Sequence, residues 1–156
     1  MRSTIRKVNY ADVDALREVI ESNQLFPSEL LLSMSKDYFN NKAPKEIWLT
    51  KDEDSVPIAL VYCAPEEMTE GTYNLYLIAV HKNYHGKGIG SEMISYLEEL
   101  LCEQGARILI VETSALPEFT LTRAFYDKLH FEKEAVIRDF YQEGEDKVVF
   151  WKKLSS

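Results

Sequence analysis

Runs of alternating or unbroken apolar residues predict seven strands along the chain. β-Branched and aromatic residues dominate these runs, and polar turns such as "KDEDSV" separate them. The run "ARILIVETS" is almost entirely apolar, which is typical of a strand buried on both faces. The last two runs flank Gly144 and predict a closing hairpin. The expected strands are residues 4–10, 46–52, 57–65, 71–82, 106–114, 132–141 and 147–154.

Apolar residues spaced three and four apart predict four helices between these strands. In the first helix, Asp12 is a candidate N-cap. Gly105 follows the third helix, where a left-handed C-cap is expected. The predicted apolar face of the first helix consists of Val13, Leu16, Val19 and Ile20. The expected helices are residues 11–23, 27–41, 89–104 and 121–130.

In chain order these elements read β-α-α-β-β-β-α-β-α-β-β. The order predicts an α/β (α+β) fold, with a mixed central sheet of about seven strands flanked by about four helices. No repeat, low-complexity tract or linker interrupts the pattern, so residues 1–156 are expected to form a single domain.

Composition and charge exclude several functions. The formal net charge of -8 argues against a nucleic-acid partner, because such binding depends on clustered Lys and Arg. Cys63 and Cys102 show no metal-site or disulfide spacing, so we expect no metal and a reducing compartment. The N-terminus has no apolar signal core and no run is long enough to cross a membrane. We therefore expect a cytoplasmic protein with no membrane partner.

The stretch "HGKGIG", residues 85–90, stands between a predicted strand and a predicted helix. A helix start leaves N–H groups unpaired and carries partial positive charge, and glycines let the backbone approach a ligand. The stretch therefore favours a phosphate or pyrophosphate site over a simple tight turn. The P-loop pattern fails because Gly88 follows Lys87. The dinucleotide fingerprint matches only in part, because Ser91 occupies the place of its third glycine.

The same stretch resembles motif A of the GNAT superfamily of acyl-CoA-dependent N-acyltransferases, Gln/Arg-x-x-Gly-x-Gly/Ala. Gly88 and Gly90 are in place, and His85 stands where the family usually has Gln or Arg. A second stretch, "RAFYDKLHF", is similar to the family's Ala-x-x-Phe-Tyr-x-x-x-Gly-Phe, with His130 where glycine is usual. The predicted element order is also the family's order. The resemblance covers nearly the whole chain.

The resemblance implies transfer of an acetyl group from acetyl-CoA to an amine. In the family, loop amides hold the pyrophosphate and the edge of the preceding strand pairs with the pantetheine, beyond which the two central strands splay apart. The implied cofactor-binding residues are Ile78, Ala79, Val80, His85, Gly86, Lys87, Gly88, Ile89, Gly90, Ser91 and Tyr126.

Tyr126 stands at the position of the family's general acid. A phenol pKa near 10 suits protonation of a leaving thiolate. From the residues alone, the alternative is an aromatic that anchors the short helix beside Phe125 and Phe131.

Glu112 is the candidate catalytic base. It ends an apolar strand, where partial desolvation would raise the pKa of a carboxyl and suit a base acting through water. The alternative is a solvated carboxylate at a strand end. Tyr76 and Asn74 on the preceding strand are its rivals, and acids such as Glu66 are interpreted as solvated surface.

The acceptor cleft of the family is built from the first two helices, the loop after the fifth strand and the final hairpin. Here those segments mix aromatic with acidic residues, which favours a cationic amine with some apolar bulk, either a small molecule or a peptide. The substrate-binding candidates are Phe26, Glu29, Tyr76, Glu118, Asp139 and Tyr141.

We therefore expect an acetyl-CoA-dependent N-acetyltransferase acting by direct transfer to a primary amine, with a homodimer as one assembly to be tested. The alternative from another class is a GNAT-fold module that senses acyl-CoA or an amine without turnover. A dinucleotide-binding oxidoreductase is a more distant alternative.

Overall fold

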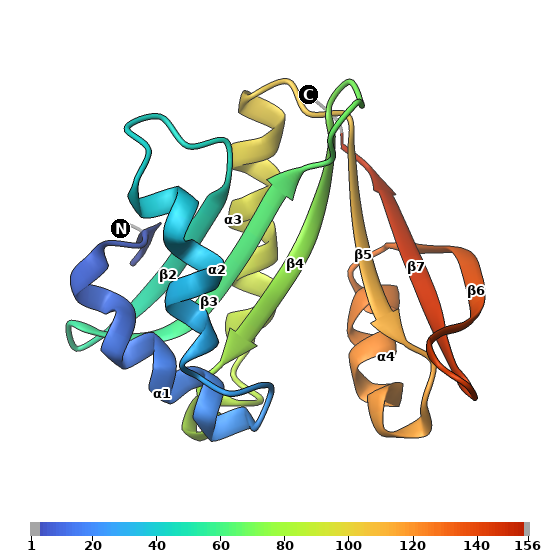
Figure 1. Ribbon diagram of the computed structural model, residues 1–156, viewed down its shortest axis with the longest axis horizontal. Coiled ribbons are helices and arrows are strands. Elements are labelled where there is room, and N and C mark those ends of the chain that lie inside the picture. The colour runs from blue at the N-terminus through green and yellow to red at the C-terminus, as the bar shows by residue number, and fades with distance from the viewer. Residues whose placement is uncertain (1–3, 155–156) are drawn as a thin grey trace. The chain divides into compact units, whose positions relative to one another are not determined.

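The computed structural model describes residues 4–154 and confirms the predicted order of elements (Figure 1). Within these residues the strands are β1 (Ile5–Lys7), β2 (Ile47–Glu53), β3 (Val56–Pro65), β4 (Thr72–Val80), β5 (Ile108–Ser114), β6 (Glu132–Gln142) and β7 (Glu145–Lys153). The α-helices are α1 (Val13–Asn23), α2 (Leu30–Phe39), α3 (Ile89–Glu103) and α4 (Thr120–Lys128). Single 3-10 turns are η1 (Tyr10–Asp12), η2 (Lys82–Tyr84) and η3 (Pro117–Phe119).

The strands form a mixed seven-stranded sheet in the order β1-β2-β3-β4-β5-β7-β6. The pairs β1–β2, β2–β3, β5–β7 and β6–β7 are antiparallel, and β4 runs parallel to β5. The chain forms two compact units, one with the residues up to Ala64 and Leu77–Glu99, the other with Pro65–Tyr76 and the residues from Leu100 onward.

The core of the first unit lies between α1, α2 and the strands beside them (Figure 1). The predicted apolar face of α1 is confirmed, because Leu16, Val19 and Ile20 are almost fully buried. They belong to one cluster with Trp48 and Leu60 on the strands. This apolar packing holds α1 in place, and α1 in turn contacts the loop that follows β4.

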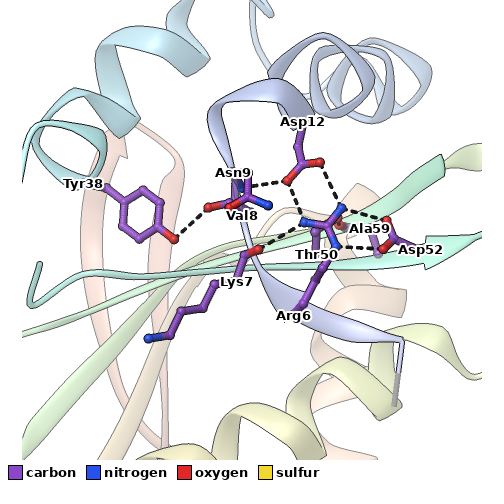
Figure 2. A network of polar contacts seen from close by, with 9 residues as sticks. All are labelled: Arg6, Lys7, Val8, Asn9, Asp12, Tyr38, Thr50, Asp52 and Ala59. Atoms are coloured by element: carbon purple, nitrogen blue, oxygen red, sulfur yellow. Dashed lines mark hydrogen bonds and ion pairs between the residues drawn. The ribbon is translucent and has the colours of Figure 1, made fainter. Parts of the chain in front are cut away.

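A charged network fastens β1 to its neighbours in the first unit (Figure 2). Arg6 binds both oxygens of Asp52 at 2.7 and 2.9 Å, and both oxygens of Asp12 at 2.8 and 2.9 Å. Asp12 also accepts a hydrogen bond from the Asn9 N–H at 2.7 Å. The expectation that Asp12 caps α1 with its side chain is therefore wrong, because the guanidinium offers that carboxylate stronger, charge-assisted bonds.

In the second unit, α4 packs on one face of β7. The Tyr126 ring lies 5.6 Å from those of Phe131 and Phe150, between centroids. Phe150 pairs with Val111 in the β5–β7 register, so Val111 also belongs to this face. Glu112 is the next residue of β5 and points to the opposite face, because side chains alternate along a strand.

Candidate functional site

The loop after β4 has the backbone shape that an anion site requires. Gly86 and Gly88 adopt φ values of +76° and +78°, which residues with a Cβ rarely occupy. A Cβ at either glycine would meet no atom within 4 Å, so the space beside the backbone is open to a ligand. The 15-residue helix α3 begins at once with Ile89, and its first N–H groups have no intrahelical partner. The loop residues therefore fit a pyrophosphate.

An acid in the first turn of α3 is already neutralised. Glu92 pairs with Lys51 of β2 at 2.9 Å. The ion pair reduces the repulsion that a free carboxylate would exert on an anion at this helix start.

The end of β4 is tied to α1 and to the loop itself. The Val80 carbonyl accepts two hydrogen bonds, from Asn23 Nδ2 at 2.8 Å and from His85 Nε2 at 2.7 Å. The Lys82 N–H donates to Ser22 Oγ at 3.1 Å. His85 therefore holds the loop in place through Val80, a role that its motif position alone did not indicate.

Tyr126 lies on α4 with its ring buried, at 3% exposure. Among the described residues no hydrogen-bond partner is found for its hydroxyl, so the phenolic proton is not committed to a protein acceptor. Burial raises the pKa of Tyr126 above its ordinary value, because the charged phenolate is poorly solvated there. The residue is both a core aromatic and a phenol that stays protonated at neutral pH.

Glu112 forms an ion pair that its sequence position did not reveal. Lys147 Nζ lies 3.3 Å from Glu112 Oε2, and the Lys147 side chain is only 9% exposed. The same ammonium lies 3.7 Å from the centroid of the Phe140 ring. Lys147 thus joins the candidate base on β5 to an aromatic of β6.

A second carboxylate, Glu66, binds the rival candidates on β4. Its Oε1 accepts hydrogen bonds from Asn74 Nδ2 at 2.9 Å and from the Tyr76 hydroxyl at 2.6 Å. The interpretation of Glu66 as solvated surface is therefore wrong. The sequence contained a signal for these contacts, because Asn74 and Tyr76 are polar residues within an apolar strand. Asn74 is also buried, and a buried side-chain amide needs a hydrogen-bond partner.

The pairing between β4 and β5 ends just before Tyr76 on β4 and Glu112 on β5. The register couples Thr72–Leu75 with Ile108–Val111, although β4 continues to Val80 and β5 to Ser114. Glu112 and Tyr76 are the first residues beyond the paired stretch on their strands. Asn74 pairs with Ile110, so alternation puts Asn74, Tyr76 and Glu112 on one face of the second unit.

The remaining acceptor candidates differ in their surroundings. Phe26 is half-buried against the core of the first unit, whereas Glu29 and Glu118 are exposed. Asp139 has a φ of +55° and accepts the Gly144 N–H, so it shapes the β6–β7 hairpin. Burial, and then the charges of Glu112 and Glu145, raise the pKa of Tyr141. Of these candidates, Tyr141 is the one whose pKa is raised by the charge of Glu112.

Within residues 4–154 no helix is long and apolar enough to cross a membrane. No group of three or more His, Cys, Asp or Glu side chains there is arranged to hold a metal ion.

The glycine loop thus lies between the fourth strand and the third α-helix of a mixed sheet. The family model described as "Acetyltransferase (GNAT) family" matches residues 15–131, and the chain belongs to this family of acetyltransferases. This membership removes the dinucleotide-binding oxidoreductase as an alternative. No curated protein matches the sequence significantly.

Solved structures share the fold over almost the whole chain. A protein from Desulfovibrio desulfuricans assigned to the GNAT family is 27% identical, with a TM-score of 0.93 over 99% of this chain and 100% of its own. The ribosomal-protein-S18-alanine N-acetyltransferase from Escherichia coli is 19% identical, with a TM-score of 0.79 over 99% and 96%. An aminoglycoside 6'-N-acetyltransferase complexed with coenzyme A is 12% identical, with a TM-score of 0.80 over 97% of both chains.

Proposed function

We propose that this chain transfers the acetyl group of acetyl-CoA to a primary amine by direct attack of the amine on the thioester. The observation that carries the proposal is the pair of left-handed glycines at the start of α3, with open space beside them. The coenzyme A complex of a structural neighbour supports the choice of ligand.

The loop and the end of β4 are the proposed binding residues for acetyl-CoA. Backbone N–H groups of Gly86 to Ser91 would hold the pyrophosphate. The edge of Ile78–Val80 would pair with the pantetheine amides. The Val80 carbonyl already accepts two hydrogen bonds, from Asn23 and His85, so both of its lone pairs are occupied before the pantetheine binds. His85, Lys87, Ile89 and Gly90 complete the loop.

Proton transfer is assigned to two residues on opposite faces of β5. As the amine nitrogen bonds to the carbonyl carbon and the carbon–sulfur bond breaks, Tyr126 gives its proton to the leaving sulfur. Glu112 takes the proton of the attacking amine through a water. Direct transfer needs both groups at the thioester, one to take the proton that the amine loses and one to supply the proton that the thiolate gains.

The acceptor is proposed to be a cationic amine with apolar bulk. Glu66 and Glu112 are two carboxylates on the face that carries Tyr76, and Tyr141 and Phe140 supply aromatic surface near Glu112. The names of both N-acetyltransferase neighbours specify acetylation of a nitrogen. Small molecules and peptides both fit this description. The cytoplasmic location expected from the cysteine pattern remains a prediction.

Calorimetry with acetyl-CoA and an amine screen that follows free thiol test the proposal. We expect micromolar binding, abolished in Gly88→Asp, because the new carboxylate would occupy the pyrophosphate position. Gly105→Asp is the matched control, since Gly105 also has a left-handed φ, +79°, and open space around it. Unchanged affinity in a folded Gly88→Asp variant would contradict the CoA site. Binding without thiol release for any amine would contradict the transfer reaction.

A further inference from the structure

Glu66 is a carboxylate held in a fixed position by its neighbours in the second unit. Its backbone N–H donates to the Thr72 carbonyl at 2.8 Å, and its own carbonyl accepts from Thr69 Oγ1 at 2.8 Å. Its side-chain Oε1 accepts from Asn74 Nδ2 and from the Tyr76 hydroxyl. Asn74 is 3% exposed, so its amide ties the carboxylate to the interior of the unit. The position of the carboxylate is therefore set before any ligand binds.

Glu66 differs from Glu112 in the balance of its charge. Within residues 4–154, no Lys or Arg forms an ion pair with Glu66, and its Oε2 accepts no hydrogen bond from another residue. Glu112, by contrast, is paired with the Lys147 ammonium at 3.3 Å. The face that carries Tyr76 and Glu112 thus has one paired carboxylate beside one whose charge and second oxygen are open to a ligand.

A carboxylate with no cation of its own suits a ligand group that keeps its positive charge. The reacting nitrogen must lose a proton before it attacks the thioester, and a direct carboxylate contact would favour its charged, unreactive form. A cation elsewhere in the acceptor stays charged throughout the reaction. Its contact with Glu66 contributes equally to the bound substrate and to the transition state, so it lowers KM without raising kcat.

We propose that Glu66 binds a second cationic group of the acceptor, on the basis of the proposed function in which the reacting amine lies near Glu112. Asn74 is the register partner of Ile110, two residues before Glu112, so the Cα atoms of Asn74 and Glu112 are about 8 Å apart. A few carbon atoms span a distance of this order. A short aliphatic diamine and a peptide with a basic side chain near its amino terminus share this chemistry.

Two pairs of amines of similar size test the proposal by thiol release. 1,4-Diaminobutane carries an ammonium where 1-aminopentane has a methyl group, and glycyl-arginine amide carries a guanidinium where glycyl-leucine amide has an isobutyl group. In at least one pair the dication should have a kcat/KM about 10-fold higher, through its KM, because hydrogen bonds to charged groups are worth about this factor. The pair that shows the preference identifies a small diamine or a peptide as the source of the second cation.

Glu66→Gln removes the charge but keeps a side-chain oxygen for Asn74 and Tyr76, so the loop should stay in place. In this variant the preference for the dication should fall to about twofold or less, through a higher KM for the dication. Glu67→Gln is the matched control, because Glu67 is the exposed neighbour and its replacement changes the net charge equally. Its preference should match that of the wild type. Circular dichroism checks that each variant is folded.

The wild type by itself can overturn the proposal, whether or not Glu66→Gln folds. A wild type that prefers neither dication by more than about twofold does so. A preference that Glu66→Gln retains, or that Glu67→Gln loses to the same extent, also overturns it.

Calorimetry with the same four amines on the protein loaded with coenzyme A separates this inference from the proposed function. If no amine releases thiol, tighter binding of a dication that depends on Glu66 supports the second-cation site although the transfer reaction fails. Binding that does not depend on Glu66 overturns the site. Thiol release from all four amines without a preference overturns the site while the transfer reaction is retained.

Discussion

At the scale of single residues, the two proposed proton-transfer groups have different surroundings. Tyr126 is buried among aromatic rings, without a hydrogen-bond partner among the described residues. The Glu112 side chain stays partly exposed to solvent and forms an ion pair with Lys147. The phenol is thus available as a donor, whereas the carboxylate is fixed in one orientation before any substrate arrives.

Replacing Tyr126 with Phe removes one hydroxyl and leaves the ring packing intact, so the protein should remain folded. If Tyr126 is the acid, kcat should fall by about 10²- to 10⁴-fold with little change in acetyl-CoA affinity. Because burial raises the pKa of this phenol, it stays protonated well above neutral pH, and the loss should be similar at pH 7 and pH 9. Steady-state kinetics and calorimetry measure both quantities. Equal turnover would leave Tyr126 as a core aromatic only.

Replacing Glu112 with Gln keeps an acceptor for Lys147 but removes the ability to take a proton. Turnover should fall most near neutral pH and recover as rising pH deprotonates the free amine by itself. Glu145→Gln is a matched control, because Glu145 is the other carboxylate whose charge reaches Tyr141. A pH-independent loss would indicate that Glu112 only positions the amine. No loss would move the base to the side of β4 that carries Tyr76 and Glu66.

At the scale of elements, hydrogen bonds tie the end of α1 to the segment between β4 and the glycine loop. Asn23 and His85 both donate to Val80, and Ser22 accepts from Lys82. An element expected to border the acceptor therefore contacts the loop expected to bind acetyl-CoA. The loop is preordered, which reduces the entropy lost on binding.

His85→Ala should weaken acetyl-CoA binding by roughly fivefold, since one net hydrogen bond is worth about 1 kcal/mol. His85→Gln can donate to the same carbonyl and should bind within about twofold of the wild type. Asn23→Ala removes the other donor and should act in the same direction as His85→Ala. Calorimetry gives the dissociation constants, and thermal melting checks that the fold is intact. If Gln and Ala weaken binding equally, the imidazole contacts the ligand instead of holding the loop.

At the scale of the whole molecule, the net charge of -8 creates a field that attracts cations. Salt screens this field, with a Debye length of about 8 Å at physiological strength. The proposed binding of the anionic acetyl-CoA therefore depends on local backbone groups rather than on overall charge. A cationic acceptor benefits from the field over longer distances.

The KM for a polycationic amine should therefore rise with added salt, whereas that for acetyl-CoA should change less. The double variant Glu118→Gln/Asp139→Asn should raise the amine KM at low salt. Glu53→Gln/Asp54→Asn on the β2–β3 hairpin changes the net charge equally and serves as control. Initial rates measured over a salt series give the KM for the amine and the KM for acetyl-CoA at each salt concentration. Preference for neutral or acidic amines, or equal effects of the two double variants, would remove the role of local charge.

The sequence by itself determined the order of elements, the family and the position of the glycine loop between β4 and α3. Apolar periodicity fixed the face of α1, because burial of that face dominates its packing. The left-handed φ expected at Gly105 is confirmed, and Gly86 and Gly88 in the loop also adopt left-handed φ values. His130, where the family has glycine, likewise adopts a φ of +70°. Such features depend on neighbours in the chain, so a sequence can reveal them.

Only the tertiary structure decided the partners of the polar side chains. Lys147 reaches Glu112 across two paired strands, and Glu66 reaches Tyr76 across ten residues of chain. Asp12 binds Arg6 instead of capping α1, because the fold brings a guanidinium within reach. Hydrogen bonds and ion pairs depend on distance and direction to within a fraction of an ångström. Those distances are set by packing and strand register, which the pattern of residue types leaves open.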